Sequence, residues 1–432
     1  MSIPSGKERT VSVHSARKKS RRTTSDIKTP DLRDDWKQFP VLFQKYCEAR
    51  LCPMYPKVYN FLERDDGQFI QIDYPLSNMD YKTTENKLVI YTYTNREMNI
   101  RKTVCKCPHV IDTRMFFALN QTLLNYSSMT CLKLEFCNIG ADHIIILQDS
   151  LKTKNIITEL SLVGNPIKEQ SYYRLIYCGL KSLILRFCEI TDRGLKKIAR
   201  EFLNHDSDFA TLIHLDLSSN MIFDEGCKYI ATILKCDRTL QSISLIDCKI
   251  TDVGCATLIS CFNKFALNFE EVYKRRTIRL EYLKQLQKVN VDKDEPEFIL
   301  LENKINRYPF TNHESFAAEG EIFCMGNYTL ISLNISHNNL TSSSLDLVLK
   351  SLVEQTETFG NGKGLRRVIL EGQNTPECED IKSKISDFLS SKNRKSQTTS
   401  SAEGSMRSRS SAEAHSSAHS AGFDKEEKVS FQ

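Results

Sequence analysis

No apolar run in this 432-residue sequence is long enough to span a bilayer, and residues 1–22 contain no apolar core of the kind that a secretion signal needs. The net charge of +5 is too small to indicate nucleic-acid binding by itself. We therefore expect a partner other than a membrane or a nucleic acid.

Catalytic and metal-binding motifs are missing as well. The sequence contains no HExxH, no GxSxG, no P-loop and no GxGxxG after an apolar strand. The nearest lookalike, GNGKG at residues 360–364, lacks P-loop spacing, and Cys105, Cys107 and His109 are spaced too tightly for a zinc knuckle. These absences predict a protein that is not an enzyme and that needs no cofactor, no metal and no small-molecule substrate.

What is present is a repeat, seen most clearly at residues 212–234. Leu212, Leu215 and Leu217 have the spacing LxxLxL, Asn220 follows, and the apolar residues then recur at helical spacing. A strand and a helix of this size each have an apolar side that one unit cannot cover. The segment is therefore one leucine-rich repeat that must stack on copies of itself.

Copies of this frame flank the segment on both sides. The first residues of the full copies are Met129, Ile157, Leu180, Leu212, Leu240 and Leu330, and a weaker copy starts at Leu365. The unequal spacing between copies predicts loops of unequal length. The pattern predicts an α/β leucine-rich repeat solenoid, with a curved parallel β-sheet on the concave face and helices on the convex face.

The ninth position of the frame is either asparagine or cysteine. Asn165 and Asn220 alternate with Cys137, Cys188 and Cys248. A small polar side chain there can turn inward and satisfy backbone groups where the chain leaves the strand, so we interpret these cysteines as structural. Fifteen cysteines without a secretion signal also favour a reducing, intracellular setting.

The rest of the chain divides by composition. We predict a disordered basic tail at 1–30, an α+β capping region at 31–128, repeats one to five at 129–266, a charged helix and flexible insertion at 267–325, C-terminal repeats at 326–389 and a disordered Ser-rich tail at 390–432. Within the capping region, residues 87–94 are strand-like and residues 113–124 helix-like. The cluster RKKSRR at 17–22 is compatible with a nuclear-import signal, a patch for an acidic surface such as tubulin or nucleic acid, or a solvated tail.

Three features together resemble a known family. These are the ribonuclease-inhibitor-type repeats, the charged helix with EEVYKRR, and the detached repeat LISLNISHNNL followed by GLRRVILEGQN. The combination is similar to the vertebrate leucine-rich repeat-containing protein 71 family. The resemblance implies a non-enzymatic protein of ciliated or flagellated cells that is attached to an axoneme, and it carries over no catalytic residue.

Geometry predicts where a partner would bind. The third, fifth and seventh positions of each strand project onto the concave face, and the eighth follows at its rim. The candidate protein-binding residues are Lys133, Glu135, Phe136, Glu159, Arg186, Phe187, His214, Asp216 and Asp247. Aromatic residues and arginine are enriched in interface hot spots, whereas the alternative is that Phe136 and Phe187 each pack on a neighbouring turn.

The expected function is a protein-interaction scaffold with axonemal or microtubule-associated partners. The expected location is the cytoplasm or cytoskeleton, in the axoneme of a cilium or flagellum, with the nucleus as the other possibility. Two other functions stay open: regulation of a small GTPase, and a nuclear role that uses the N-terminal basic cluster.

Overall fold

The computed structural model describes residues 35–52, 56–72, 88–203, 211–287, 296–306, 308–372 and 375–416. Its main feature is an eleven-stranded sheet with the strand order β14-β13-β9-β8-β7-β6-β5-β4-β3-β1-β2. The predicted basic tail at 1–30, with its RKKSRR cluster, lies outside the described residues. Within the described ranges, no helix combines the length and the apolar character that crossing a membrane would require.

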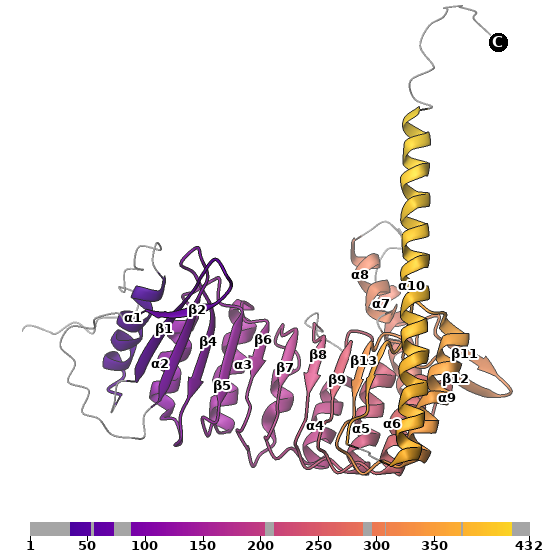
Figure 1. The fold of residues 1–432 in the computed structure, drawn as a ribbon, viewed down its shortest axis with the longest axis horizontal. Coiled ribbons are helices and arrows are strands. Elements are labelled where there is room, and N and C mark those ends of the chain that lie inside the picture. Colours follow the sequence, from indigo (N-terminus) through magenta and orange to yellow (C-terminus); the bar gives the residue numbers. More distant parts are fainter. Residues whose placement is uncertain are drawn as a thin grey trace, which may run out of the picture.

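The repeats supply seven parallel strands of this sheet (Figure 1). They are β5 (Cys131–Glu135), β6 (Glu159–Ser161), β7 (Ser182–Ile184), β8 (His214–Asp216), β9 (Ser242–Ser244), β13 (Ser332–Asn334) and β14 (Arg367–Ile369). Leu160 pairs with Leu183, Leu183 with Leu215, and Leu215 with Ile243, so the fourth-position residues stack in register. Each is at most 1% exposed, and burying one such side chain contributes about 1.5–3 kcal/mol. The predicted solenoid is confirmed.

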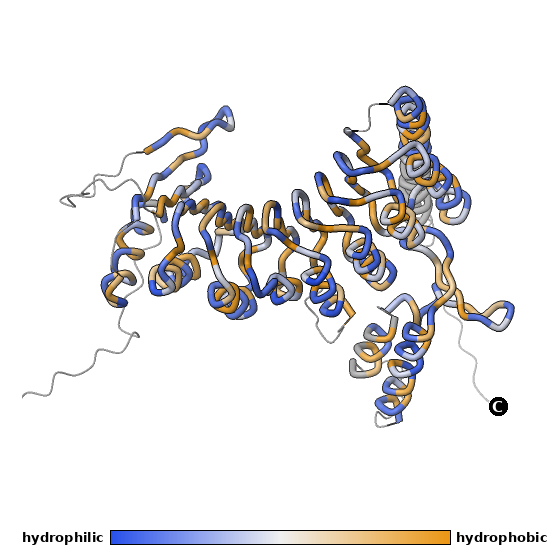
Figure 2. The backbone as a smooth tube through the Cα atoms, turned by 90° about the horizontal axis from the view of Figure 1, so that it is seen from below, coloured by the Kyte–Doolittle hydropathy of each residue, from blue (hydrophilic) through white to orange (hydrophobic). Residues whose placement is uncertain are grey.

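Helices cover one side of the sheet and leave the other side open (Figure 2). The helical segments after the repeat strands are α3 (Ala141–Lys154), η2 (Ser171–Leu175), α4 (Asp192–Leu203), α5 (Asp224–Cys236), α6 (Asp252–Ile259), η3 (Ser260–Phe262) and α9 (Ser342–Phe359). The ends of the arch rise on the strand side, so the strands line the concave face, as predicted.

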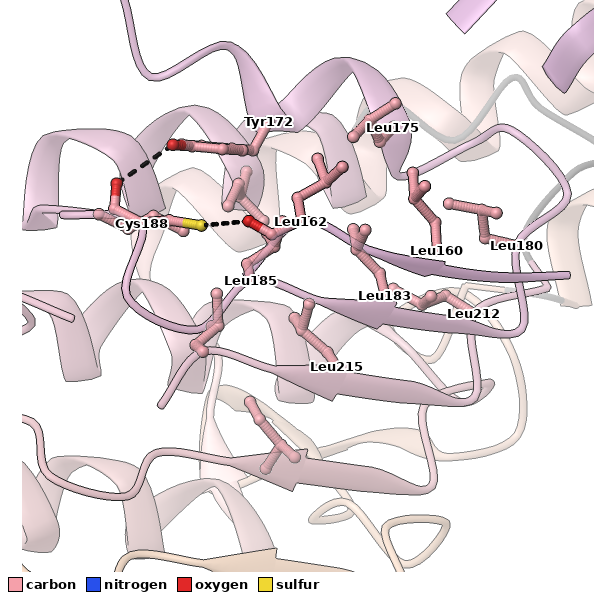
Figure 3. Close-up of a cluster of buried hydrophobic side chains, with 14 of the residues drawn as sticks. Leu160, Leu162, Tyr172, Leu175, Leu180, Leu183, Leu185, Cys188, Leu212 and Leu215 are labelled. Carbon is pink, nitrogen blue, oxygen red and sulfur yellow. Dashed lines mark hydrogen bonds between the residues drawn. The ribbon is translucent and has the colours of Figure 1, made fainter. Parts of the chain in front are cut away.

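The shortest interval between repeats uses a single 3₁₀ turn, η2, in place of an α-helix. Tyr172 from this turn is fully buried (Figure 3). Its hydroxyl donates to the carbonyls of Asn165 and Cys188, at 2.6 and 3.1 Å, and accepts from the Ile167 N–H at 2.9 Å. One aromatic side chain thus fills the space of the missing helix and satisfies backbone groups of two repeats.

The ninth-position side chains turn inward as predicted. The Asn220 amide oxygen accepts from the backbone N–H groups of Cys188 and Ile190, both at 3.0 Å, and its amide nitrogen donates to the Leu185 and Leu217 carbonyls. The Cys188 thiol lies 3.1 Å from the Leu162 carbonyl (Figure 3). Burial raises the pKa of that thiol to about 11, which keeps it protonated and unreactive at neutral pH. The structural interpretation of these cysteines fits this geometry.

The N-terminal region continues the sheet and the helical layer. Its elements are α1 (Asp35–Ala49), β1 (Lys57–Glu63), β2 (Phe69–Ile72), β3 (Val89–Thr94), β4 (Ile100–Lys106) and α2 (Thr113–Leu123). Strand β4 pairs parallel with β5, and Phe39, Phe43 and Phe116 are buried in the same core as the repeats. The predicted strand at 87–94 and helix at 113–124 correspond to β3 and α2.

Residues 267–325 contain the predicted charged helix, and their described part is folded beyond that helix, where flexibility was predicted. This part forms α7 (Phe269–Leu286), α8 (Pro296–Asn306) and a three-stranded sheet of β10 (Phe265–Ala266), β12 (Glu321–Cys324) and β11 (Ser315–Ala318). Tyr308, Phe310 and Cys324 form a small core with Cys236 of α5 and Leu267. Aromatic residues inside a charged segment thus find a partner surface that composition does not reveal.

Helix α10 (Pro376–Ser416) begins before residue 390, where the Ser-rich tail is predicted to start, and extends past it. The helix begins with a proline, which is favoured at a first helical position. Cys378, Ile381, Ile385 and Leu389 are buried at helical spacing and belong to the main core. These buried residues anchor the first part of α10, and no proline after Pro376 interrupts the helix. Residues 417–432 lie outside the described residues.

Candidate functional site

The eighth-position residues form a row at the rim where the strands end. Phe136, Gly164, Phe187, Ser219, Asp247, His337 and Gly372 all have a positive φ. The Phe136 N–H donates to the Val163 carbonyl at 2.8 Å, and the Asp247 N–H donates to the Ser336 carbonyl at 3.0 Å. Each left-handed residue thus extends the hydrogen bonding beyond the strands and turns its own side chain to the rim.

Phenylalanine at two of these positions is unusual, because a bulky residue with positive φ is strained. Phe136 and Phe187 are 55% and 54% exposed. The Phe136 ring lies against Gly164, where a Cβ atom would collide with it. Phe136 therefore packs on the neighbouring turn, as the alternative interpretation proposed, yet half of its surface still faces solvent.

Arg186 and Asp216 form a rigid pair on the adjoining strands. The Arg186 Nε donates to the Asp216 carboxylate at 2.6 Å, and that carboxylate also accepts from the Ser218 N–H at 3.0 Å. The Asp216 side chain is 2% exposed, whereas the Arg186 side chain is 46% exposed. Within the described part of the chain, the terminal nitrogens of Arg186 have no hydrogen-bond partner. The guanidinium is therefore held in one direction with its fork open to solvent.

His214 lies beside this pair on β8. Burial lowers the pKa of His214 below its ordinary value, and Arg186 acts in the same direction while Asp216 opposes the shift. The imidazole is therefore neutral at neutral pH, and Arg186 carries the positive charge of this group of three.

The other predicted residues lie near this group or further along the face. Lys133 faces Glu159 at 3.5 Å, and Glu135 faces Lys106 at 3.9 Å. These half-exposed ion pairs contribute little to stability and present mixed charge on β5 and β6. Asp247 stands apart at the rim after β9, where it lies 4.0 Å from Lys249.

An aromatic row on the N-terminal strands extends the same face, and sequence reasoning missed it. Tyr59 stacks on Tyr91 with ring centroids 5.5 Å apart, and Phe61 stacks on Tyr93 at 5.2 Å. The ammonium group of Lys102 lies 4.9 Å from the Tyr93 ring. All are partly exposed. The sequence shows that aromatic residues alternate along KVYNFLE and VIYTYT. Only the pairing of β1 with β3 brings the two sets together into one row.

Comparisons with known proteins agree with the fold. A family model described as "Leucine Rich repeat" matches residues 179–199 and 210–231. Ribonuclease inhibitor from Mus musculus is 26% identical over 235 residues, which are 53% of this chain and 50% of that protein. NACHT, LRR and PYD domains-containing protein 14 from Mus musculus is 29% identical over 141 residues, 31% of this chain and 14% of that protein.

Ribonuclease inhibitor from Sus scrofa is likewise 29% identical over 141 residues, 31% of this chain and 30% of that protein. The chain thus spans half the length or less of these relatives. The fold is a leucine-rich repeat solenoid, and the family model matches two of its repeats. The matched relatives include ribonuclease inhibitors and NACHT, LRR and PYD domains-containing proteins.

Proposed function

We propose that this chain is a non-enzymatic protein-interaction scaffold that binds a partner protein on the N-terminal half of its concave face. The observation that carries the proposal is the open guanidinium of Arg186, oriented by buried Asp216 and adjacent to the exposed ring of Phe187. The name of one matched relative says that it inhibits a ribonuclease, which supports a binding role for this repeat class.

The chemistry of the face indicates the kind of partner. A preoriented arginine binds a carboxylate in a forked geometry with little loss of side-chain entropy. Phe136 and Phe187 offer exposed apolar area along the rim beside that charge. The partner surface that fits is therefore an acidic side chain next to apolar ones, with the aromatic row of β1 and β3 as a second contact region.

We further propose that the partner belongs to the axoneme of a cilium or flagellum. The support is the resemblance of EEVYKRR, the detached repeat and GLRRVILEGQN to the leucine-rich repeat-containing protein 71 family. Retention of the chain in detergent-extracted axonemes is the expected result, and complete release into the detergent fraction would contradict this placement.

The binding surface is tested with Arg186→Gln, Phe187→Ala and Asp216→Asn in one variant. Arg186→Glu with Phe187→Ala is a poorer test, because it would place a second carboxylate against the buried Asp216 carboxylate. The Gln and Asn pair retains hydrogen bonding while it removes both charges. A matched control, Arg193→Gln with Phe223→Ala, changes exposed residues on the helical side.

The partner is first identified by proximity labelling in ciliated cells, and its affinity is then measured by titration calorimetry. We expect the concave-face variant to bind about 100-fold more weakly, as the loss of two hot-spot residues implies, while the control binds as the wild type does. The far-UV circular dichroism should stay unchanged. Equal affinity of the concave-face variant and the wild type would overturn the proposal.

A further inference from the structure

Helix α7 carries an apolar stripe that no described part of the chain covers. Phe269, Tyr273, Leu280 and Leu283 are 86%, 66%, 58% and 51% exposed, and no residue of α7 is buried. With Arg276 they follow one another at alternating steps of four and three residues. That spacing is the seam of a two-helix coiled coil.

The helix is nevertheless held firmly on its other side. Arg275 Nε donates to the Phe310 carbonyl at 2.8 Å, Arg279 donates to the Thr311 carbonyl at 3.2 Å, and Lys274 reaches the Leu203 carbonyl. Asn268 and Glu271 form a capping box at its start. Helices α7 and α8 stand outside the row of repeats near its C-terminal end (Figure 1). The stripe, which consists of Phe269, Tyr273, Arg276, Leu280 and Leu283, is therefore presented by a preordered helix.

We infer that the α7 stripe binds the α7 stripe of a second copy of this chain in antiparallel orientation. Antiparallel pairing places Tyr273 opposite Leu283 and Arg276 opposite Leu280 of the second copy. Glu270 at the start of the helix then lies beside Lys284 of the second copy at its end, and the twofold axis crosses the seam at the level of Ile278, the midpoint of both seam pairs. Every contact therefore occurs twice in a closed dimer.

The charged residues of α7 favour the antiparallel orientation and a second copy of this chain as the partner. In a parallel pair, Arg276 would face Arg276 of the second copy within the seam and Lys284 would lie beside Arg279, so like charges would meet at both places. In the antiparallel pair both ends are attractive. Arg276 packs its aliphatic stem along the seam and keeps its guanidinium in water. The stripe is thus complementary to its own reversed copy in both apolar spacing and flanking charge.

The mass of the full chain is measured by sedimentation equilibrium over a concentration series up to about 100 μM. We expect a monomer–dimer equilibrium for the wild type. Leu280→Glu with Leu283→Glu places four carboxylates in the seam and should make the chain monomeric throughout. The control, Phe223→Glu with Val253→Glu, changes two exposed apolar residues outside α7 and should dimerise normally.

A charge exchange tests the orientation. Glu270→Lys alone and Lys284→Glu alone should each weaken the dimer about tenfold, because two attractive pairs become repulsive. The double variant, Glu270→Lys with Lys284→Glu, should restore the wild-type dissociation constant. Failure of that rescue overturns the antiparallel pairing.

Two further outcomes overturn the inference itself. One is a wild type that remains monomeric at every concentration, including the case in which the stripe proves to bind a different protein. The other is a dimer that persists unchanged in the Leu280→Glu, Leu283→Glu variant. Circular dichroism of each variant shows whether it is folded, and the concave-face affinity measurement shows whether the proposed partner binding is independently retained.

Discussion

The alternation of asparagine and cysteine at the ninth position reflects a division of hydrogen bonding between neighbouring repeats. The Asn165 amide oxygen accepts from the Cys137 N–H, and the Asn220 amide oxygen accepts from the Cys188 N–H. The cysteine thiols donate to carbonyls of the preceding turn and of their own turn. An asparagine therefore accepts from N–H groups of the preceding turn, which a cysteine does not replace, and it also donates to carbonyls of its own turn. A cysteine can then occupy the repeat in between.

Replacing Asn220 by alanine should cost about 2–4 kcal/mol of unfolding free energy, because it leaves two N–H groups and at least two carbonyls buried without this partner. Asn220→Cys should cost less, because a thiol still donates to a carbonyl. Urea denaturation measures both, with the exposed change Lys196→Ala as a control. Equal losses for the alanine and cysteine variants would show that packing volume, not hydrogen bonding, determines this position.

At the scale of elements, the insertion is attached to the solenoid by a buried ion pair. Arg238, just after α5, lies 2.8 Å from Glu314, and their side chains are 12% and 5% exposed. Arg238 also donates to the Leu234 carbonyl at 3.0 Å, and Glu314 accepts from the Tyr328 hydroxyl at 3.0 Å. The pair therefore links the end of a helix, the insertion and the start of the next repeat.

Arg238→Ala should destabilise the docking of the insertion by about 3–5 kcal/mol, because Glu314 is left as an uncompensated buried charge. Hydrogen exchange followed by mass spectrometry should show faster exchange at residues 296–324 and little change in β5 to β8. Adding Glu314→Gln removes the buried charge and should recover part of the protection. Exchange that accelerates uniformly along the chain would contradict this local role.

At the scale of the whole molecule, the solenoid is continuous across the insertion. Strand β9 pairs directly with β13, and Asp252 accepts hydrogen bonds from the Thr341 N–H and hydroxyl at 2.9 and 2.7 Å. The Asn327 N–H donates to the Cys261 carbonyl at 2.8 Å, so the two ends of the insertion meet. The insertion is therefore an addition to a complete row of repeats.

Replacing residues 264–325 with a short glycine-serine linker should accordingly leave a folded solenoid. The loss of the small core around Cys236 should lower stability by about 1–3 kcal/mol, since few buried side chains are uncovered. Thermal unfolding should remain cooperative, partner binding on the concave face should persist, and self-association should disappear. Non-cooperative unfolding would mean that the repeats on the two sides depend on the insertion for their contact.

The sequence by itself determined the repeat architecture, the direction in which Leu160, Leu183 and Leu215 point, and the side of the sheet that carries Arg186 and Phe187. These follow from local periodicity, because a leucine two positions from another on a strand must share its face. The inward direction of the Asn and Cys side chains at the ninth position could be predicted in the same way, from their place in the repeat frame.

Only the tertiary structure decided which distant segments meet. The pairing of β1 with β3 makes one aromatic row, the burial of Asp216 orients Arg186, and the small core beneath α7 directs its apolar stripe outward. Each depends on contacts between residues far apart in the chain, such as Tyr308 with Cys236. Periodicity shows which face of an element is apolar. The packing of the whole chain determines which other element covers that face.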